Sequence, residues 1–373
     1  MRILVTLLVL LCAGISCARA DPPAYHAGAT RVTVQDVVPL DALIAYPTEA
    51  AEVPFRAGPF SIAASRDAPI ASGVSFPIVL FSHGNGRSGG SSLVHRDLIA
   101  FLARQGFIVV APSHPGTSNP LEDRPRQIHK ALDRLFTDQR FATHADHARV
   151  AIMGFSFGGA VALVVAGAVP NLAHLAAYCR NRTDDPKACD AVPADSSSSG
   201  TVMGKPADVL PLKAIVLMEP FGALFDKDGL KSVEMPALLY RAQQSDLAAE
   251  GTIFALAAGL PRAPQQETTT GGHCVRVVCR VIGSGIIAPR RSNSAHFSST
   301  VARHYRAKPR ARGLASPAKA CGVTPGCIPC RYEPAPRSPG PPERTTASGD
   351  GRSPASPGNV FVSIASFRQE VRR

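Results

Sequence analysis

A serine at position 156 stands between two glycines, in the pentapeptide Gly-Phe-Ser-Phe-Gly at residues 154–158. A short apolar run, residues 150–153, precedes it, and small apolar residues, 159–169, follow it. A buried strand, a sharp turn with the serine and then a helix form the nucleophile elbow, which exposes a hydroxyl for attack on an acyl carbon. The glycines are expected to let strand and helix approach without side-chain clashes. We therefore predict that Ser156 is a catalytic nucleophile.

An activated serine needs a histidine base and an acid that orients the histidine, and with this elbow both follow the serine in the chain. His273 comes after a strand-like run and two glycines, and it is the predicted base. Asp246 follows a predicted strand, residues 236–240, through a short polar loop, and it is the first choice for the acid. Glu219, at the end of the predicted strand 214–218, is the alternative acid.

The tetrahedral intermediate of acyl transfer needs two backbone N–H donors for its oxyanion. Phe157, the residue after the serine, is expected to supply one donor. Asn85, in the loop after another apolar run, is expected to supply the second, with Gly84 as the next choice. His83 and His114 precede the serine in the chain, so we expect them to shape the loops around the site rather than to act as the base.

Two other kinds of site are suggested by spacing but are not supported by their context. The glycines of residues 84–89 have the spacing of a dinucleotide fingerprint, yet residues 111–113 lack the acid that binds the ribose. Three cysteines in residues 321–330 have no paired histidine or fourth cysteine at the spacing of a zinc finger. We therefore predict neither an organic cofactor nor a metal ion.

The elements that must position these residues alternate between strands and helices. Strands are predicted at residues 30–38, 40–46, 77–82, 107–111, 150–153, 214–218 and 236–240, and residues 268–273 are expected to end a last strand. Helices are predicted at 92–105, 126–139, 159–169 and 247–260. This alternation indicates an α/β fold, with a mostly parallel sheet and helices on both of its faces. Residues 170–210 are polar and interrupt the alternation, so we expect them to form an insert over the C-terminal edge of the sheet.

The first 20 residues have the three parts of a secretory signal peptide. Arg2 supplies a positive charge, residues 3–11 are apolar, and the last three residues form an Ala-x-Ala cleavage site. We expect cleavage after Ala20 and a periplasmic or secreted mature protein, with lipidation of Cys17 as a less favoured alternative. No other stretch is apolar enough to predict a transmembrane helix. In an oxidising compartment Cys179 and Cys189, both in the polar insert, are expected to form a disulfide.

The composition changes abruptly after Cys274. Residues 275–373 contain 17 Lys and Arg against 4 Asp and Glu, so they account for the net charge of +12, and residues 1–274 are nearly neutral. Arg, Pro, Ser and Gly dominate this basic tail, which is typical of a disordered segment or of a sequence translated out of frame. We favour the second interpretation. The predicted folded domain covers residues 21–274 and is not expected to bind nucleic acid.

Four motifs together resemble those of a known family. They are Phe-Ser-His-Gly-Asn-Gly at residues 81–86, Ala-Pro-Ser-His-Pro-Gly at 111–116, Asp-Arg-Pro at 123–125 and Gly-Phe-Ser-Phe-Gly-Gly at 154–159. From about residue 30 to 274 the chain resembles the serine α/β-hydrolases known as predicted dienelactone hydrolases, which are similar in turn to platelet-activating-factor acetylhydrolases. The resemblance implies an α/β-hydrolase fold and a triad of Ser156, an acid and His273.

Two details of the resemblance affect the assignment of the site. True dienelactone hydrolases use a cysteine nucleophile, whereas this chain has a serine. The acetylhydrolases have their acid after the strand that corresponds to residues 214–218, which keeps Glu219 as an alternative to Asp246.

These features predict a secreted serine hydrolase that cleaves carboxylic esters or lactones through an acyl-enzyme on Ser156. Its expected partner is a small-molecule ester, and the sequence does not indicate an oligomeric state. One alternative is a catalytically impaired α/β-hydrolase that acts as a binding protein, because the sequence pattern ends one residue after His273. A second alternative is a protein that binds polyanions or membrane surfaces through its basic tail.

Overall fold

The computed structural model describes residues 24–85, 90–115, 119–180, 182, 184–189, 206 and 209–272. The predicted signal peptide, the predicted basic tail and His273 lie outside the described residues, so the boundaries proposed for them remain predictions. In the described part of the chain, no helix combines the length and the apolar character that a membrane crossing requires.

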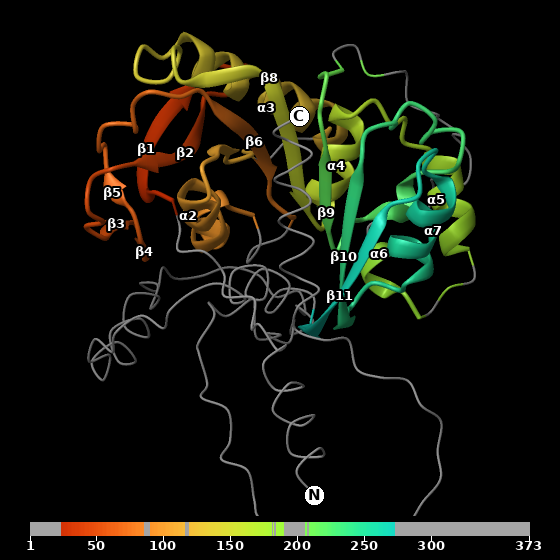
Figure 1. The fold of residues 1–373 in the computed structure, drawn as a ribbon. Coiled ribbons are helices and arrows are strands. Elements are labelled where there is room, and N and C mark those ends of the chain that lie inside the picture. The colour runs from red at the N-terminus through yellow and green to blue at the C-terminus, as the bar shows by residue number, and fades with distance from the viewer. Residues whose placement is uncertain are drawn as a thin grey trace, which may run out of the picture.

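A nine-stranded sheet forms the centre of the described structure, in the order β11-β10-β9-β8-β6-β7-β2-β1-β5 (Figure 1). The strands are β1 (His26–Val34), β2 (Leu40–Thr48), β5 (Ser65–Arg66), β6 (Phe76–Ser82), β7 (Ile108–Pro112), β8 (Ala145–Phe155), β9 (Ile215–Met218), β10 (Ala237–Gln244) and β11 (Gln265–Gly272). Strands β6 to β11 pair in parallel, whereas β2 is antiparallel to both β1 and β7. The prediction of an α/β fold with a mostly parallel sheet is therefore confirmed.

Strand β6 shows why these segments form a buried parallel sheet. All seven of its residues are buried, because helices cover both faces and no position needs to meet water. Ile78 and Leu80 belong to one core, with the apolar side chains of the helices that follow β7 and β8. Val79 and Phe81 belong to the opposite core, with the helix that follows β6. The alternation of side chains along a strand thus assigns successive residues to different faces.

The helices lie close to their predicted positions. They are η1 (Ser92–His95, 3₁₀), α2 (Arg96–Arg104), α3 (Pro120–Thr137), α4 (Phe157–Val165), α5 (Leu172–Cys179), α6 (Pro186–Cys189), η3 (Gly222–Leu224, 3₁₀), η4 (Glu250–Phe254, a π-helix) and α7 (Ala255–Gly259). Helix α3 begins at Pro120 rather than at residue 126. Proline at the first helical position and acids in the first turn both favour this earlier start.

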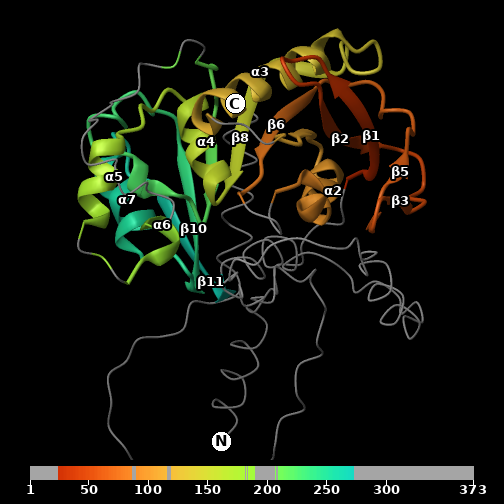
Figure 2. The ribbon, with the colours of Figure 1, turned by 180° about the vertical axis from the view of Figure 1, so that it is seen from behind.

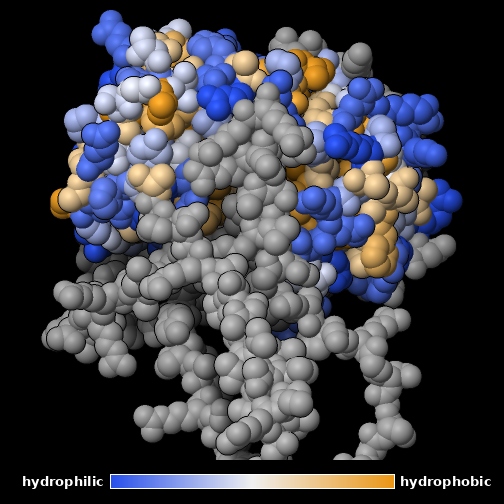
Figure 3. Space-filling view, viewed as in Figure 1, coloured by the Kyte–Doolittle hydropathy of each residue, from blue (hydrophilic) through white to orange (hydrophobic). Residues whose placement is uncertain are grey.

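The two ends of the sheet differ in what surrounds them. Strands β1, β2 and β5 lie at one end, whereas α5, α6 and α7 lie beside β10 and β11 at the other (Figures 1 and 2). A separate pair of short strands, β3 (Phe55–Ala57) and β4 (Phe60–Ile62), forms a hairpin near the first end. Hydrophilic and apolar side chains are interspersed over the described surface in Figure 3.

Candidate active site

Ser156 lies in the sharp turn that joins β8 to α4, as the sequence predicted. Its backbone angles are φ 54° and ψ −122°, in a region that residues other than glycine seldom adopt. Two hydrogen bonds hold this conformation. The Ser156 N–H donates to the Met218 carbonyl over 2.9 Å, and the Gly159 N–H donates to the Ser156 carbonyl over 2.8 Å. Such strain costs about 1–3 kcal/mol and is a recognised feature of functional sites.

Glycines on either side of the serine are required by the close packing of the turn. A Cβ atom added to Gly154 would overlap the carbonyl group of Gly158. A Cβ atom added to Gly158 would overlap the carbonyl oxygen of Ser82, at the end of β6. Backbone atoms cannot move aside as the end of a flexible side chain can. The expected role of the glycines, close approach of strand and helix, is therefore confirmed.

The loop after β6 lies directly against the serine. An ideal Cβ on Gly84 would be 3.3 Å from the Cβ of Ser156, so the backbone of this loop borders the side chain of the turn. Asn85 follows at an exposed position, and its side-chain Oδ1 accepts a hydrogen bond from Arg124 over 2.6 Å. Phe157, on the other side of the serine, is the first residue of α4. The N-terminus of a helix favours negative charge, so both predicted oxyanion donors border a site suited to an anion.

Glu219 is fully buried in the segment that runs beside the elbow. It follows β9 directly, and its own φ is 49°. Its Oε1 accepts a hydrogen bond from the Ala242 N–H, and its Oε2 accepts one from the Ser245 hydroxyl. The backbone N–H of Phe221, two residues later, donates to the Ser156 carbonyl over 3.2 Å. The carboxylate is thus fixed within a segment that is itself tied to the serine.

Asp246, the first choice of acid from the sequence, has a different environment. Its side chain is 52% exposed and forms an ion pair with Lys187, whose side chain is 51% exposed. Strand β10 extends to Gln244, beyond the predicted end at residue 240, so Asp246 comes two residues after the strand. The neighbouring Ser245, which sequence reasoning did not select, is the residue of this loop that contacts Glu219. A serine in a polar loop carries no signal that could have revealed this.

The predicted base, His273, lies outside the described residues. The strand that leads to it is described. Strand β11 pairs in parallel with β10 and ends at Gly272, which is opposite Gln244 in the register of the two strands. Because parallel strands end at the same edge of a sheet, the end of β11 is at the edge where Ser156 and Glu219 follow β8 and β9.

A buried polar network beneath the loop after β6 joins the two histidines that precede the serine. His83 Nε2 accepts a hydrogen bond from the backbone N–H of His114 over 3.1 Å, so its Nδ1 carries the proton and donates to the Gly84 carbonyl over 2.8 Å. His114 Nδ1 bonds to Gln127 over 2.7 Å, and its Nε2 bonds to Ser82 over 3.2 Å. Burial and the nearby His83 hold the pKa of His114 well below its usual value. His114 is therefore neutral, and both histidines support the loop through hydrogen bonds, which agrees with their expected role.

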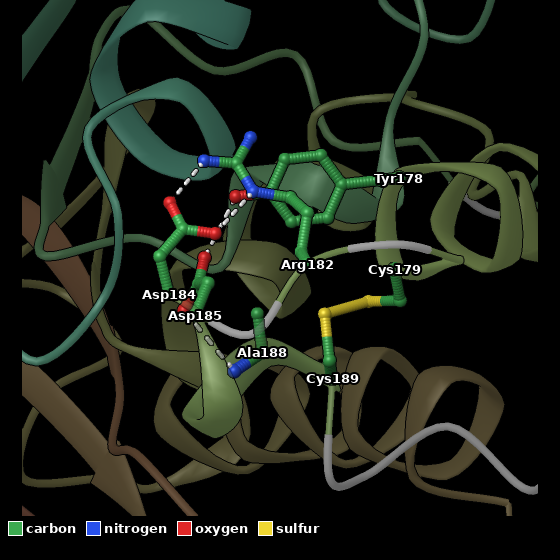
Figure 4. Close-up of a disulfide and its surroundings, with 7 residues drawn as sticks. All are labelled: Tyr178, Cys179, Arg182, Asp184, Asp185, Ala188 and Cys189. Atoms are coloured by element: carbon green, nitrogen blue, oxygen red, sulfur yellow. Dashed lines mark hydrogen bonds and ion pairs between the residues drawn. A yellow bond between two sulfur atoms is a disulfide. The ribbon is translucent and has the colours of Figure 1, made fainter.

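The cysteine pair of the insert forms the expected disulfide, Cys179–Cys189, between α5 and α6 (Figure 4). Two neighbouring residues connect this part of the insert to the segment that follows β10. Lys187 pairs with Asp246, and Arg182 lies 3.4 Å from a carboxylate oxygen of Glu250. The described part of the insert thus packs near the ends of the parallel strands, beside the loop that contains Ser245. Among the described residues, no group of three or more His, Cys, Asp and Glu side chains could hold a metal ion.

Comparison with known proteins found sequence similarity to two cutinases. Cutinase est2 of Thermobifida alba is 31% identical over 129 residues, which are 31% of this chain and 43% of that protein. Cutinase est1 of the same organism is 30% identical over 129 residues, which are 31% of this chain and 44% of that protein. The chain thus spans less than half the length of these relatives. No protein-family model matches the chain. The similarity supports a serine α/β-hydrolase and does not extend to the dienelactone hydrolase group.

Proposed function

We propose that this chain is a secreted serine hydrolase of the α/β-hydrolase fold, which cleaves carboxylic esters through an acyl-enzyme on Ser156. The observation that carries the proposal is the strained turn of Ser156 between β8 and α4, with the Gly84 backbone against its side chain. The similarity to proteins named cutinases, a name that denotes ester hydrolases, gives independent support. Secretion is supported by the predicted signal peptide and by the disulfide in the insert.

In the proposed reaction the Ser156 hydroxyl attacks the ester carbonyl carbon, and His273 accepts its proton. The backbone N–H groups of Phe157 and Asn85 bind the oxyanion that forms on the carbonyl oxygen. The histidine then protonates the leaving alcohol, and an acyl-enzyme remains. Water, deprotonated by the same histidine, hydrolyses the acyl-enzyme and releases the carboxylic acid. No step of this proposal uses a metal ion or an organic cofactor.

We propose Glu219 rather than Asp246 as the acid that orients His273. Glu219 is completely buried, accepts two hydrogen bonds and precedes by two residues the Phe221 N–H that bonds to the Ser156 carbonyl. A carboxylate fixed in this way can hold an imidazole in one orientation and stabilise its positive charge. Asp246, by contrast, is half exposed and is engaged by Lys187. Its charge is therefore screened by water and already paired.

The test is hydrolysis of p-nitrophenyl butyrate together with labelling by a fluorophosphonate. The wild-type protein is expected to release p-nitrophenol and to carry one phosphonyl group on Ser156, as mass spectrometry would show. The Ser156→Ala variant is expected to lose both activities while it unfolds at the same urea concentration or a higher one. A folded wild-type protein that neither turns over the ester nor reacts with the probe would exclude the proposed enzyme. That result would favour the alternative of a binding protein.

A further inference from the structure

Arg124, the centre of the Asp-Arg-Pro motif at residues 123–125, is buried beside the proposed oxyanion donors. Only 5% of its surface is exposed. Its Nη1 donates to the His83 carbonyl over 3.0 Å, and its Nη2 donates to Asn85 Oδ1 over 2.6 Å. Its guanidinium carbon also lies 5.1 Å from the centre of the Phe157 ring. One side chain of α3 thus contacts both the loop after β6 and the first residue of α4.

The charge of Arg124 is not paired with any carboxylate of the described residues. Among the described residues, no carboxylate lies within ion-pair distance of its guanidinium, and its Nε has no hydrogen-bond acceptor. Burial alone lowers the pKa of Arg124 to about 10, which still leaves it charged at neutral pH. Arg126, two residues later on the same helix, pairs with Asp36 and Asp123. Burying an unpaired cation is costly, so its presence at this position calls for an explanation.

The neighbours of Arg124 indicate what it could stabilise. Its two hydrogen bonds fix the backbone on one side of the Asn85 N–H and the side chain of Asn85 itself. Its contact with the Phe157 ring is a cation–π interaction, which steadies the residue that would supply the second donor. Burial keeps His114 neutral, so this histidine adds no positive charge to the site. A site of this kind works best when its donors are fixed before the reaction and water is excluded.

We propose that Arg124 is a positioning residue for the oxyanion hole. It holds the N–H groups of Asn85 and Phe157 in their relative positions, and its unpaired charge is balanced when the oxyanion forms in the transition state. A buried positive charge beside the two donors favours the negatively charged transition state more than the neutral ester. This inference rests on the proposed function, because it concerns the same reaction at Ser156.

The test compares Arg124→Met, which has a similar apolar stem without the charge, with Arg124→Lys and the control Arg126→Met. The assays measure kcat and KM for p-nitrophenyl butyrate and the inhibition constant of butylboronic acid. The value of kcat is calculated from the concentration of active sites, which is titrated with fluorophosphonate. A boronic acid adds to a serine hydroxyl and forms a tetrahedral adduct that resembles the transition state. R124M is expected to lower kcat about 100-fold with little change in KM, which approaches the loss of one oxyanion donor. The inhibition constant of the boronic acid should rise in parallel.

The other two variants separate positioning from a general effect on folding. R124K retains a charge but cannot form both hydrogen bonds of the guanidinium fork, so its kcat should lie between wild type and R124M. It also provides the measurement if R124M does not fold. R126M loses two ion pairs of the same helix, and its kcat per titrated site should remain within twofold of wild type.

Three outcomes would overturn the inference. One is a Met or Lys variant with wild-type kcat and boronic acid affinity. Another is a loss of activity that active-site titration explains entirely by a smaller folded fraction. In both cases the proposed function would stand, because the wild-type protein is active. A wild-type protein without turnover or boronic acid binding would instead overturn both proposals.

Discussion

The substitution Glu219→Gln removes the negative charge of the proposed acid and nearly preserves its shape. The carbonyl oxygen of the glutamine can continue to accept the Ala242 N–H. Its amide group can donate to Ser245, because a hydroxyl can rotate and accept instead of donating. Ser245 is partly exposed, so its hydroxyl proton can bond to water, whereas the second amide N–H of the glutamine gains no acceptor from these two contacts. The free energy of unfolding is therefore expected to fall by about 1–3 kcal/mol, the cost of one buried donor without a partner.

The expected effect on the reaction is much larger. Proton transfer to His273 creates an imidazolium, which loses its neighbouring negative charge in the Glu219→Gln variant. In a serine protease triad the corresponding change of acid to amide lowers kcat about 10⁴-fold. We expect a fall in kcat of about 10³- to 10⁴-fold here, which corresponds to about 4–5 kcal/mol in the activation barrier.

Asp246→Asn is the matched control, because it removes one carboxylate charge from the other candidate acid. Its ion pair with Lys187 joins two half-exposed side chains and is worth less than about 1 kcal/mol. We expect kcat within twofold of wild type. The assay is p-nitrophenyl butyrate hydrolysis per active site titrated with fluorophosphonate, alongside urea unfolding followed by circular dichroism. The reverse order of effects, a loss of 10³-fold in Asp246→Asn and under tenfold in Glu219→Gln, would refute our choice of acid.

Three further substitutions test other parts of the structure. Gly158→Ala should cost more than about 3 kcal/mol in urea unfolding or prevent folding, because its Cβ would overlap the Ser82 carbonyl oxygen. Replacing Cys179 and Cys189 together by serine should lower the free energy of unfolding by about 3 kcal/mol, given their separation of 10 residues. His95→Phe should stabilise the protein by about 1 kcal/mol, because both buried imidazole nitrogens lack hydrogen-bond partners in the described structure. Burial lowers the pKa of His95 to about 3, so the unfolded chain binds a proton below pH 6.5 that the folded chain does not. The free energy of unfolding of the wild type should therefore fall as the pH is lowered from 6.5 to 3. In His95→Phe it should fall less steeply over the same range.

Each of these three has its own control. Gly58→Ala tests the cost of positive φ alone, since a Cβ there would meet no atom within 4 Å, and about 1 kcal/mol is expected. An equal cost at both glycines would contradict the overlap argument. Dithiothreitol should destabilise wild type to the level of the double serine variant, and no effect would show that the disulfide is not formed. For His95→Phe, an unchanged slope of stability against pH would contradict the argument from its pKa.

The parts of the fold that could be predicted were those with local signals. The strand before Ser156 contains a continuous apolar run at residues 150–153, and Gly154 and Gly158 mark a turn in which a side chain would not fit. Apolar runs with helical stretches between them identified the parallel strands in the same way. The start of α3 was placed too late, because the polar first turn hides the inward stripe that begins further along.

The candidate acid could not be chosen from sequence for two physical reasons. The end of β10 depends on hydrogen bonds to both neighbouring strands, so the distance of Asp246 from the sheet is not visible in its own loop. The burial of Glu219 depends on a backbone conformation that its residue type does not favour. The contact between Arg124 and Asn85 joins residues 39 positions apart, and only the packing of α3 against the loop brings them together.

The strained backbones of Ser156 and Glu219 bear on how this chain would evolve. Both have positive φ, and hydrogen bonds between their segments link the two conformations. Glycine would adopt the conformation of Ser156 at less cost. At Glu219 glycine would relieve the backbone, but it would also leave the buried Ala242 N–H without its acceptor. Engineering that ranks substitutions by thermostability would therefore tend to replace Ser156, the side chain that the proposed reaction requires.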